Sequence, residues 1–170
     1  MKGNATIASS AGAMHFAAAF AALALGALVL AMPKGTLLHR TIGAGYVAAM
    51  LILNIAALAI YRLTGHFEPF HVLALLSLAT IARGVVPAVR RRPGWLTRHY
   101  WGMAWSYLAL LAAACSEIVV RLGLRTGILD GPWQVIAGGM TIAVLFVVLG
   151  VVVLPHLQRT AIAHMSQPQA

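Results

Sequence analysis

Residues 133–155 read WQVIAGGMTIAVLFVVLGVVVLP, and this run contains no Asp, Glu, Lys or Arg. A helix of about 20 residues is long enough to cross the ~30 Å of hydrocarbon in a bilayer. Long, almost uncharged apolar runs are typical of such spanning helices, because a charged side chain inside hydrocarbon is costly. The run therefore predicts a transmembrane helix.

Four further apolar segments precede this run, and short connectors separate them. Pro and Gly residues in the connectors end one helix before the next one begins. The five predicted helices cover residues 11–32, 40–61, 69–88, 100–120 and 133–155. A chain of 170 residues then has room for one small bundle and no soluble domain. We expect an all-α fold, an integral membrane helical bundle in which residues 1–170 form a single transmembrane domain.

The composition agrees with a membrane protein. Only 9% of the residues are charged, whereas 61% are hydrophobic, and a soluble domain needs more charge to cover its surface. The net charge is +9, from 12 Lys and Arg against three Asp and Glu. In a soluble protein this balance would suggest a nucleic-acid partner, but these basic residues stand at the ends of the apolar runs, where they set topology. We expect contact with the lipid bilayer and no nucleic-acid binding.

The basic residues are divided unevenly between the two sets of helix ends. One set carries Lys34, Arg40, Arg83, Arg90, Arg91, Arg92, Arg98 and Arg159. The other set carries Lys2, Arg62, Arg121 and Arg125. The positive-inside rule places the richer set in the cytoplasm, so we expect the N-terminus outside and the C-terminus in the cytoplasm. The first segment is expected to be a helix rather than a cleaved signal peptide, because its apolar core is about 20 residues long.

The five segments differ in their small residues. The first four are rich in Ala and Gly, which let transmembrane helices approach closely. The fifth is rich in Val and Leu and is expected to face lipid. We therefore predict a four-helix core plus one accessory helix.

One histidine stands near the start of each of the first four segments: His15, His39, His71 and His99. Because the chain alternates direction, His15 and His71 should lie on the outer side, and His39 and His99 on the cytoplasmic side. Two opposed pairs in a four-helix bundle are the arrangement that holds two b-type haems, whose iron takes neutral imidazoles as axial ligands. The alternative is that each histidine is a hydrogen-bonded residue at the membrane interface.

Neighbouring residues allow the same two interpretations. Gly26 and Gly43 would leave a gap for a macrocycle. Arg40 and Arg98 would hold haem propionates through charge-assisted hydrogen bonds; the alternative is that these two arginines only set topology. An aromatic group surrounds His99 and would line a haem edge or a quinone, or form an interfacial belt. Its members are Trp95, Tyr100, Trp101, Trp105 and Tyr107.

A second constellation uses some of the same residues. His15, His66, His71 and Glu117, with Glu68 nearby, would form a metal site on the outer side. Histidine and carboxylate ligands suit zinc and several other divalent ions. The alternative is a polar loop that happens to carry two histidines.

Glu117 is the only acidic residue well inside an apolar segment. A buried carboxylate must be neutralised, paired or ligated. It follows His99 by five helical turns, so it shares the face of that histidine and reaches the height of His15 and His71. We expect it within hydrogen-bonding or shared-ligand distance of His15 or His71; the alternative is an ion pair with Arg121.

Four stretches carry a family resemblance. They are residues 34–46 (KGTxxHRxxGxxY), 69–77 (PFHxLxxLS), 98–103 (RHYWGM) and 105–117, which opens with Trp-Ser-Tyr and ends at Glu117. Over roughly residues 14–120 the chain resembles a family of bacterial membrane proteins catalogued as domain of unknown function 2306. The resemblance implies a multi-pass protein of the bacterial inner (plasma) membrane.

The order of the histidines is also similar, more distantly, to that of diheme b-type cytochromes of the ascorbate-reducing and ferric-reductase kind. In those proteins the first and third histidines bind one haem, and the second and fourth bind the other. This resemblance implies that His15 pairs with His71 and that His39 pairs with His99, each pair around a haem b.

Three hypotheses about function follow. The first is a b-type cytochrome-like electron-transfer protein, with a quinol or a small reductant as donor. The second is a metal-binding membrane protein or metal-dependent enzyme that uses the outer His and Glu residues. The third is a non-catalytic subunit of a larger membrane complex. Whether the chain is an enzyme stays open.

Overall fold

The computed structural model describes residues 10–60, 66–67 and 69–166. Within these residues the chain forms five α-helices and no strand, which confirms the all-α prediction. They are α1 (Ser10–Ala31), α2 (Leu37–Leu58), α3 (Pro69–Arg90), α4 (Trp95–Thr126) and α5 (Pro132–Ser166). Each of them contains a stretch that is long and apolar enough to cross a membrane.

The helix boundaries agree with the predicted ones within a few residues, except in α4 and α5. Helix α4 begins after Gly94 and ends at Gly127, both of which adopt the left-handed conformation that glycine favours. Arg121 and Arg125 therefore belong to the helix and not to a connector. Helix α5 continues past Pro155 to Ser166, because proline is tolerated inside transmembrane helices.

The connector between α1 and α2 is held by side-chain caps. The Lys34 ammonium donates to the carbonyl oxygens of Val29, Leu30 and Met32 at 2.7–3.0 Å, which satisfies acceptors that the end of α1 leaves unpaired. The Thr36 hydroxyl accepts a hydrogen bond from the His39 backbone N–H at 3.1 Å and so caps the start of α2. These caps fix His39 in the first turn of α2.

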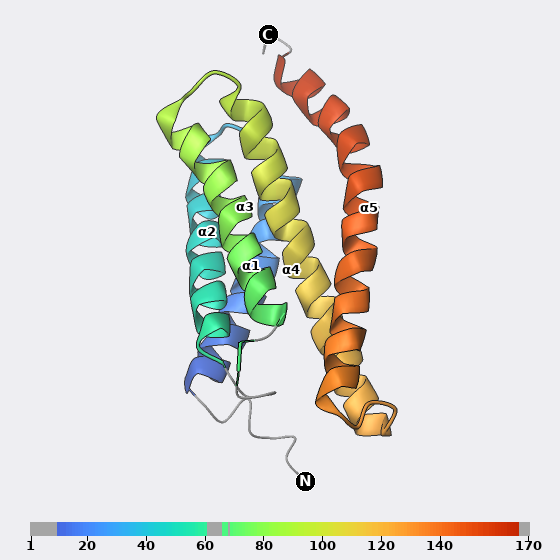
Figure 1. Cartoon of the computed structure of the whole chain (residues 1–170). Helices are drawn as coiled ribbons and strands as arrows, with labels where there is room; N and C mark the ends of the chain where they lie inside the picture. Colours follow the sequence, from blue (N-terminus) through green and yellow to red (C-terminus); the bar gives the residue numbers. More distant parts are fainter. Residues whose placement is uncertain (1–9, 61–65, 68, 167–170) are drawn as a thin grey trace.

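Successive helices run in opposite directions, and α1 to α4 form a closed bundle (Figure 1). Each helix of this bundle packs on the next, and α4 returns to α1. Helix α5 packs mainly on α4, so the four-helix core with one accessory helix is confirmed. In this order α2 and α4 occupy one diagonal of the bundle, and α1 and α3 occupy the other.

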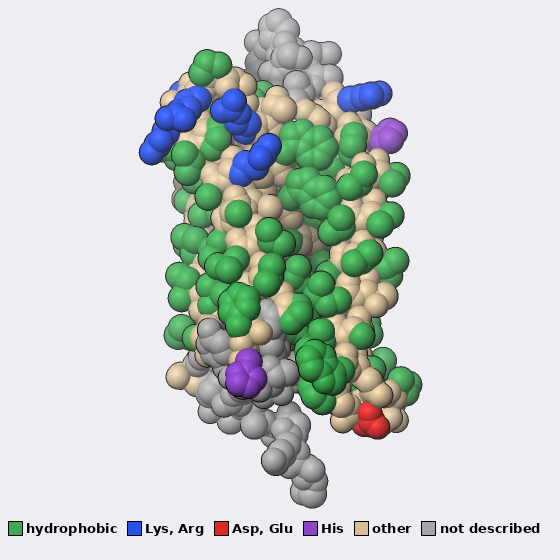
Figure 2. Space-filling model, viewed as in Figure 1, with side chains coloured by type: hydrophobic (Ala, Val, Ile, Leu, Met, Phe, Trp, Pro, Cys, Tyr) green, Lys and Arg blue, Asp and Glu red, His purple; other side chains and the backbone are tan. Residues whose placement is uncertain are grey.

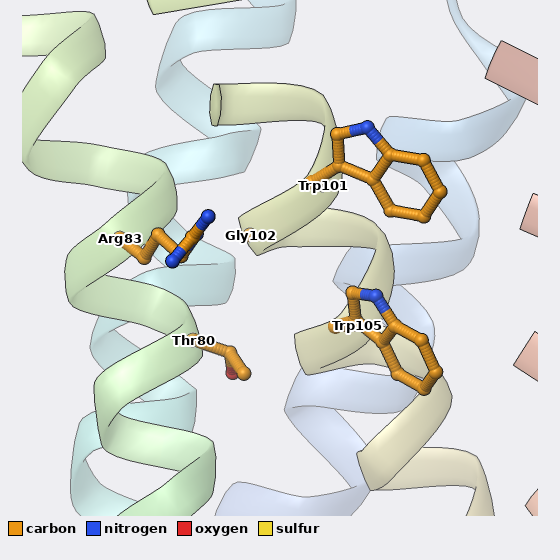
Figure 3. A pocket seen from close by; sticks show the side chains of 5 residues that line it. All are labelled: Thr80, Arg83, Trp101, Gly102 and Trp105. Carbon is orange, nitrogen blue, oxygen red and sulfur yellow. The ribbon is translucent and has the colours of Figure 1, made fainter. Parts of the chain in front are cut away.

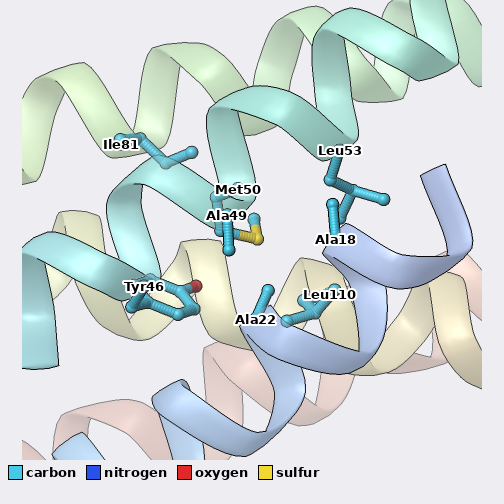
Figure 4. Close-up of a cluster of buried hydrophobic side chains, with 8 residues drawn as sticks. All are labelled: Ala18, Ala22, Tyr46, Ala49, Met50, Leu53, Ile81 and Leu110. Carbon is cyan, nitrogen blue, oxygen red and sulfur yellow. The ribbon is translucent and has the colours of Figure 1, made fainter. Parts of the chain in front are cut away.

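The core lies on the inner faces of these helices and is built from small and large side chains in alternation (Figure 4). Alanines of α1 sit against larger residues of α2, such as Met50, which is 1% exposed. A row of Val and Leu on α5 is exposed, as expected of a lipid-facing helix. The buried cluster comprises Ala18, Ala22, Tyr46, Ala49, Met50, Leu53, Ile81 and Leu110.

Helices α3 and α4 are in close contact at a pair of glycines. A Cβ added at Gly102 would collide with the backbone of Gly84. Only glycine permits this contact, as in other transmembrane helix pairs that cross at small residues. The contact brings the start of α4 against the end of α3.

Most of the Lys and Arg side chains lie at one end of the bundle. Figure 2 shows the Lys and Arg side chains on one face at the end where α2 and α4 begin, above a broad apolar band. This distribution fits the uneven division of basic residues along the sequence and the membrane location. It leaves the direction of insertion as a prediction.

Candidate functional site

His39 and His99 meet at the end of the bundle where α2 and α4 begin. Both side chains are half-buried, and they come from helices on one diagonal of the bundle. Their ring centroids are 6.5 Å apart, and the ring planes are nearly perpendicular at 78°. The structure therefore brings together one of the two predicted histidine pairs.

His99 is held in one orientation by the neighbouring helix. Its Nδ1 lies 3.0 Å from the carbonyl oxygen of Gly84. Because a carbonyl only accepts hydrogen bonds, this nitrogen carries a proton, and in the neutral ring Nε2 then keeps its lone pair. Metal-ligating histidines commonly have this arrangement. The close contact of Gly84 with Gly102 sets the position of the carbonyl.

His39 has an unsatisfied ring nitrogen. Its Nδ1 is buried and has no hydrogen-bond partner, which is uncommon for a buried polar atom and asks for a partner outside the protein chain. One turn further, a Cβ added at Gly43 would meet nothing within 4 Å, so the space next to this histidine is open on the Gly43 side.

Gly26 does not contribute to such a gap. A Cβ added there would collide with the ring of Tyr107, so this glycine makes room for an aromatic side chain. The prediction that Gly26 leaves a gap for a macrocycle is therefore wrong. Helices α1 and α4 are close here, and the Tyr107 hydroxyl donates to Leu23 O at 3.3 Å.

Charged and aromatic groups border the pair. Arg40 and Arg98 are exposed beside the two histidines, and Arg40 donates to the Gly35 carbonyl at 3.4 Å. The Trp95 ring lies 6.4 Å from the His99 ring. The pair thus has cations on the solvent side and an indole at its edge.

A buried hydrogen-bonded network lies one to two turns deeper in the bundle. The hydroxyls of Tyr46 and Ser106 are 2.9 Å apart, and Ser106 also donates to Met103 O at 2.8 Å. The rings of Tyr46 and Tyr107 are 6.2 Å apart. Tyr46 lies two turns after His39, and Ser106 lies two turns after His99, but helical spacing alone does not predict that they meet.

The outer pair is arranged differently. His15 is half-buried and donates from Nδ1 to Leu53 O at 3.3 Å, whereas His71 is 3% exposed and stacks on Phe67 at 5.0 Å. They belong to α1 and α3, at the same end of the bundle. Among the described residues no ring contact joins His15 to His71, so this pair is not brought together as the other pair is.

The proposed cluster of outer metal ligands is also dispersed. His66 is exposed, and Glu68 lies outside the described residues. In the part of the chain that the structure describes, no group of three His, Cys, Asp or Glu residues lies close enough to hold a metal ion. His15, His66, His71 and Glu117 therefore do not form a common ligand set here.

Glu117 pairs with Arg121 on its own helix. Its Oε1 accepts from Arg121 Nε at 2.5 Å, and its side chain is 46% exposed. The expected hydrogen bond to His15 or His71 is not found between these described residues, so that prediction is corrected. Helix α4 is described throughout, and none of its residues after Ala112 is buried. The helices pack less closely at this end. The face of α4 that points into the bundle at His99 is therefore exposed at Glu117.

Comparison with known proteins identifies a family. The family model described as "Predicted membrane protein (DUF2306)" matches residues 12–157. No curated protein and no solved structure matches the chain. The match covers all of α2, α3 and α4 and most of α1 and α5, including both candidate histidine pairs. The chain therefore belongs to the DUF2306 family of predicted membrane proteins, as its sequence motifs predicted.

Proposed function

We propose that this chain is a b-type cytochrome-like electron-transfer protein of the membrane, with a haem b held between His39 and His99. The observation that carries the proposal is the 6.5 Å between their ring centroids. A ligating nitrogen lies about 2 Å from the metal, and the centre of its ring about 1 Å further, so two rings on opposite sides of one ion have centroids about 6 Å apart. The spacing of this pair would allow both imidazoles to hold one haem iron.

The state of each ring supports the same conclusion. The bond from His99 Nδ1 to Gly84 O leaves Nε2 free to bind a metal. The buried Nδ1 of His39 has no partner in the protein. The open space next to Gly43 lies on the His39 side of the pair. Two imidazoles beside a space of this kind form a donor set that suits haem.

The bound haem would supply reversible one-electron chemistry, and the chain would supply ligation, orientation and electrostatics. The Gly84 carbonyl fixes the His99 ring and increases the basicity of its free nitrogen. Arg40 and Arg98 would attract the anionic propionates. The buried residues below the pair, Tyr46 and Met50, exclude water from that side.

His15 and His71 would hold a second haem, nearer the other membrane surface, only after their rings move from their present contacts with Leu53 O and Phe67. His15 lies against Leu53 O, so the two sites are separated by roughly 20 Å at ~1.5 Å per residue of α2. Such a pair of sites would carry electrons across the membrane. A quinol or a small reductant would serve as donor.

The test is a visible spectrum of the purified protein after expression with ample haem. We expect the sharp reduced-state absorption band of bis-histidine haem, and we expect His39→Ala and His99→Ala each to remove about half of it, one haem of two. His156→Ala is the matched control, because this exposed histidine of α5 bonds only locally, to Val152 O. Colourless wild-type protein would overturn the proposal, and metal analysis would then test the alternative ligand set.

The proposal includes a direction of insertion in a bacterial inner membrane. The charged end of the bundle, which holds His39 and His99, would face the cytoplasm. Reporter fusions in the connector at residues 91–94 and after the end of α5 should both give a cytoplasmic signal. A periplasmic signal from either fusion would exchange the sides of the two histidine pairs.

A further inference from the structure

A groove lies between α3 and α4. Its volume is about 370 Å³, and it is lined by Thr80, Arg83, Trp101, Gly102 and Trp105. In Figure 3 the side chains of Thr80 and Arg83 extend from α3 toward α4, and the rings of Trp101 and Trp105 extend from α4 away from α3. The edge of the Trp105 ring also packs near Gly150 of α5, where an added Cβ would lie 2.7 Å away. The groove is thus lined by polar side chains of α3 and by the two indoles of α4.

The polar groups of the groove favour an anion. The Arg83 side chain is exposed, and within the described residues it makes no hydrogen bond and no ion pair. The indole N–H groups of Trp101 and Trp105 are further donors. The Thr80 hydroxyl already donates to Ser77 O at 2.7 Å. The lining therefore offers a cation and donors to an incoming ligand, and its five residues include no carboxylate and no histidine.

The position of Arg83 in the membrane indicates the rest of the ligand. Arg83 precedes the end of α3 at Arg90 by two turns, or about 10 Å. An arginine at this depth extends its guanidinium toward the headgroup region, and tryptophans concentrate at the same level. The apolar rings lie beside and below it. A ligand that satisfies both parts has an anionic head at Arg83 and an apolar tail against the rings.

We propose that this groove binds an anionic phospholipid, with its phosphate on Arg83 and one acyl chain along Trp101 and Trp105. Arginine binds phosphate through a planar fork of donors, and the basic end of the bundle attracts anionic lipids. A quinone fits less well, because quinol oxidation requires a proton acceptor and the groove contains none. The proposal does not depend on haem binding at His39 and His99.

The proposal is tested by native mass spectrometry of the detergent-purified chain after incubation with an equimolar mixture of phosphatidylglycerol and phosphatidylethanolamine. We expect one phosphatidylglycerol to be retained preferentially. Arg83→Gln should reduce its retention about tenfold, the effect expected when a charge-assisted bond of ~1.5 kcal/mol is lost. Arg83→Lys should keep part of it, and Arg125→Gln, which changes an exposed arginine at the opposite end of α4, should leave it unchanged.

A second measurement separates binding from folding. Phosphatidylglycerol should raise the thermal unfolding temperature of the wild-type chain and of Arg125→Gln, but not that of Arg83→Gln. Equal retention of the two lipids, or equal retention by Arg83→Gln and Arg125→Gln, would overturn the proposal. A quinone that copurifies with the wild-type chain and is lost from Arg83→Gln would assign the groove to a redox ligand and overturn it as well.

Discussion

The two ends of the bundle carry the same kind of histidine pair in different states. At the end where α4 begins, the rings of His39 and His99 are 6.5 Å apart, and a glycine contact holds α3 against α4. At the other end, His15 bonds to Leu53 O, His71 stacks on Phe67, and the described residues show no ring contact between them. Equal height on diagonal helices is therefore not enough to form a pair. A close contact between neighbouring helices, such as that of α3 with α4, is needed as well.

The largest expected effect is on haem content at the first end. His99→Ala removes both the candidate ligand and the ring that bonds to Gly84, so one haem should be lost completely. His71→Ala should remove a haem that is bound more weakly, because its partner ring must move before the two can share an iron. The measurement is the haem-to-protein ratio of each variant during dilution. Faster loss of haem from His71→Ala protein than from His99→Ala protein would reverse the comparison of the two ends.

A glycine substitution tests what holds the first end together. Gly102→Ala adds a methyl group that collides with the Gly84 backbone, so α3 and α4 must separate, at a cost of about 1–3 kcal/mol. The His99–Gly84 bond should weaken with it. Gly138→Ala on α5 is the matched control, because its new Cβ meets only Leu129 Cδ1, at the ordinary contact distance of 3.8 Å. Thermal unfolding in detergent should show a lower midpoint for Gly102→Ala alone. Equal midpoints would mean that the glycine contact does not stabilise this end.

Most of the fold follows from the sequence, because hydrophobic length, turn residues and helical spacing are local properties. These local properties are enough to predict the five helices and the position of α5 at the edge of the bundle. The pairing of His39 with His99 was also within reach, since alternating direction puts both at one end. Two features could not be predicted from the sequence. The packing of the Tyr107 ring over Gly26 and the exposure of Glu117 depend on how closely α1 and α4 approach at each height, which helical spacing does not encode.

The buried network between the two ends gives a smaller effect. Tyr46→Phe removes the hydroxyl that lies 2.9 Å from Ser106 Oγ, while Ser106 keeps its bond to Met103 O. The loss of one buried hydrogen bond should destabilise the fold by about 1 kcal/mol. Haem content should stay the same at both ends, because neither candidate ligand contacts this hydroxyl. Thermal unfolding and the haem-to-protein ratio together check this, and a loss of haem from one end would place the network in that site.

The smallest expected effect concerns the open end, at Glu117. Its carboxylate is bound to Arg121 one turn along α4, and both side chains are partly exposed, at 46% and 31%. Exposed pairs at this helical spacing contribute only about 0.3–0.5 kcal/mol. The Arg121 guanidinium also lies 4.7 Å from the centre of the Phe16 ring on α1, so it keeps a contact when the carboxylate is removed. Glu117→Gln should therefore leave the unfolding midpoint almost unchanged and the haem content of both ends equal to wild type.

The informative comparison is with Arg121→Gln, which also removes the contact with Phe16 and should lower the midpoint further. A larger effect of Glu117→Gln, or a loss of haem that accompanies it, would mean that the carboxylate acts on His15 despite its pairing with Arg121, and the open end would then be a site of its own.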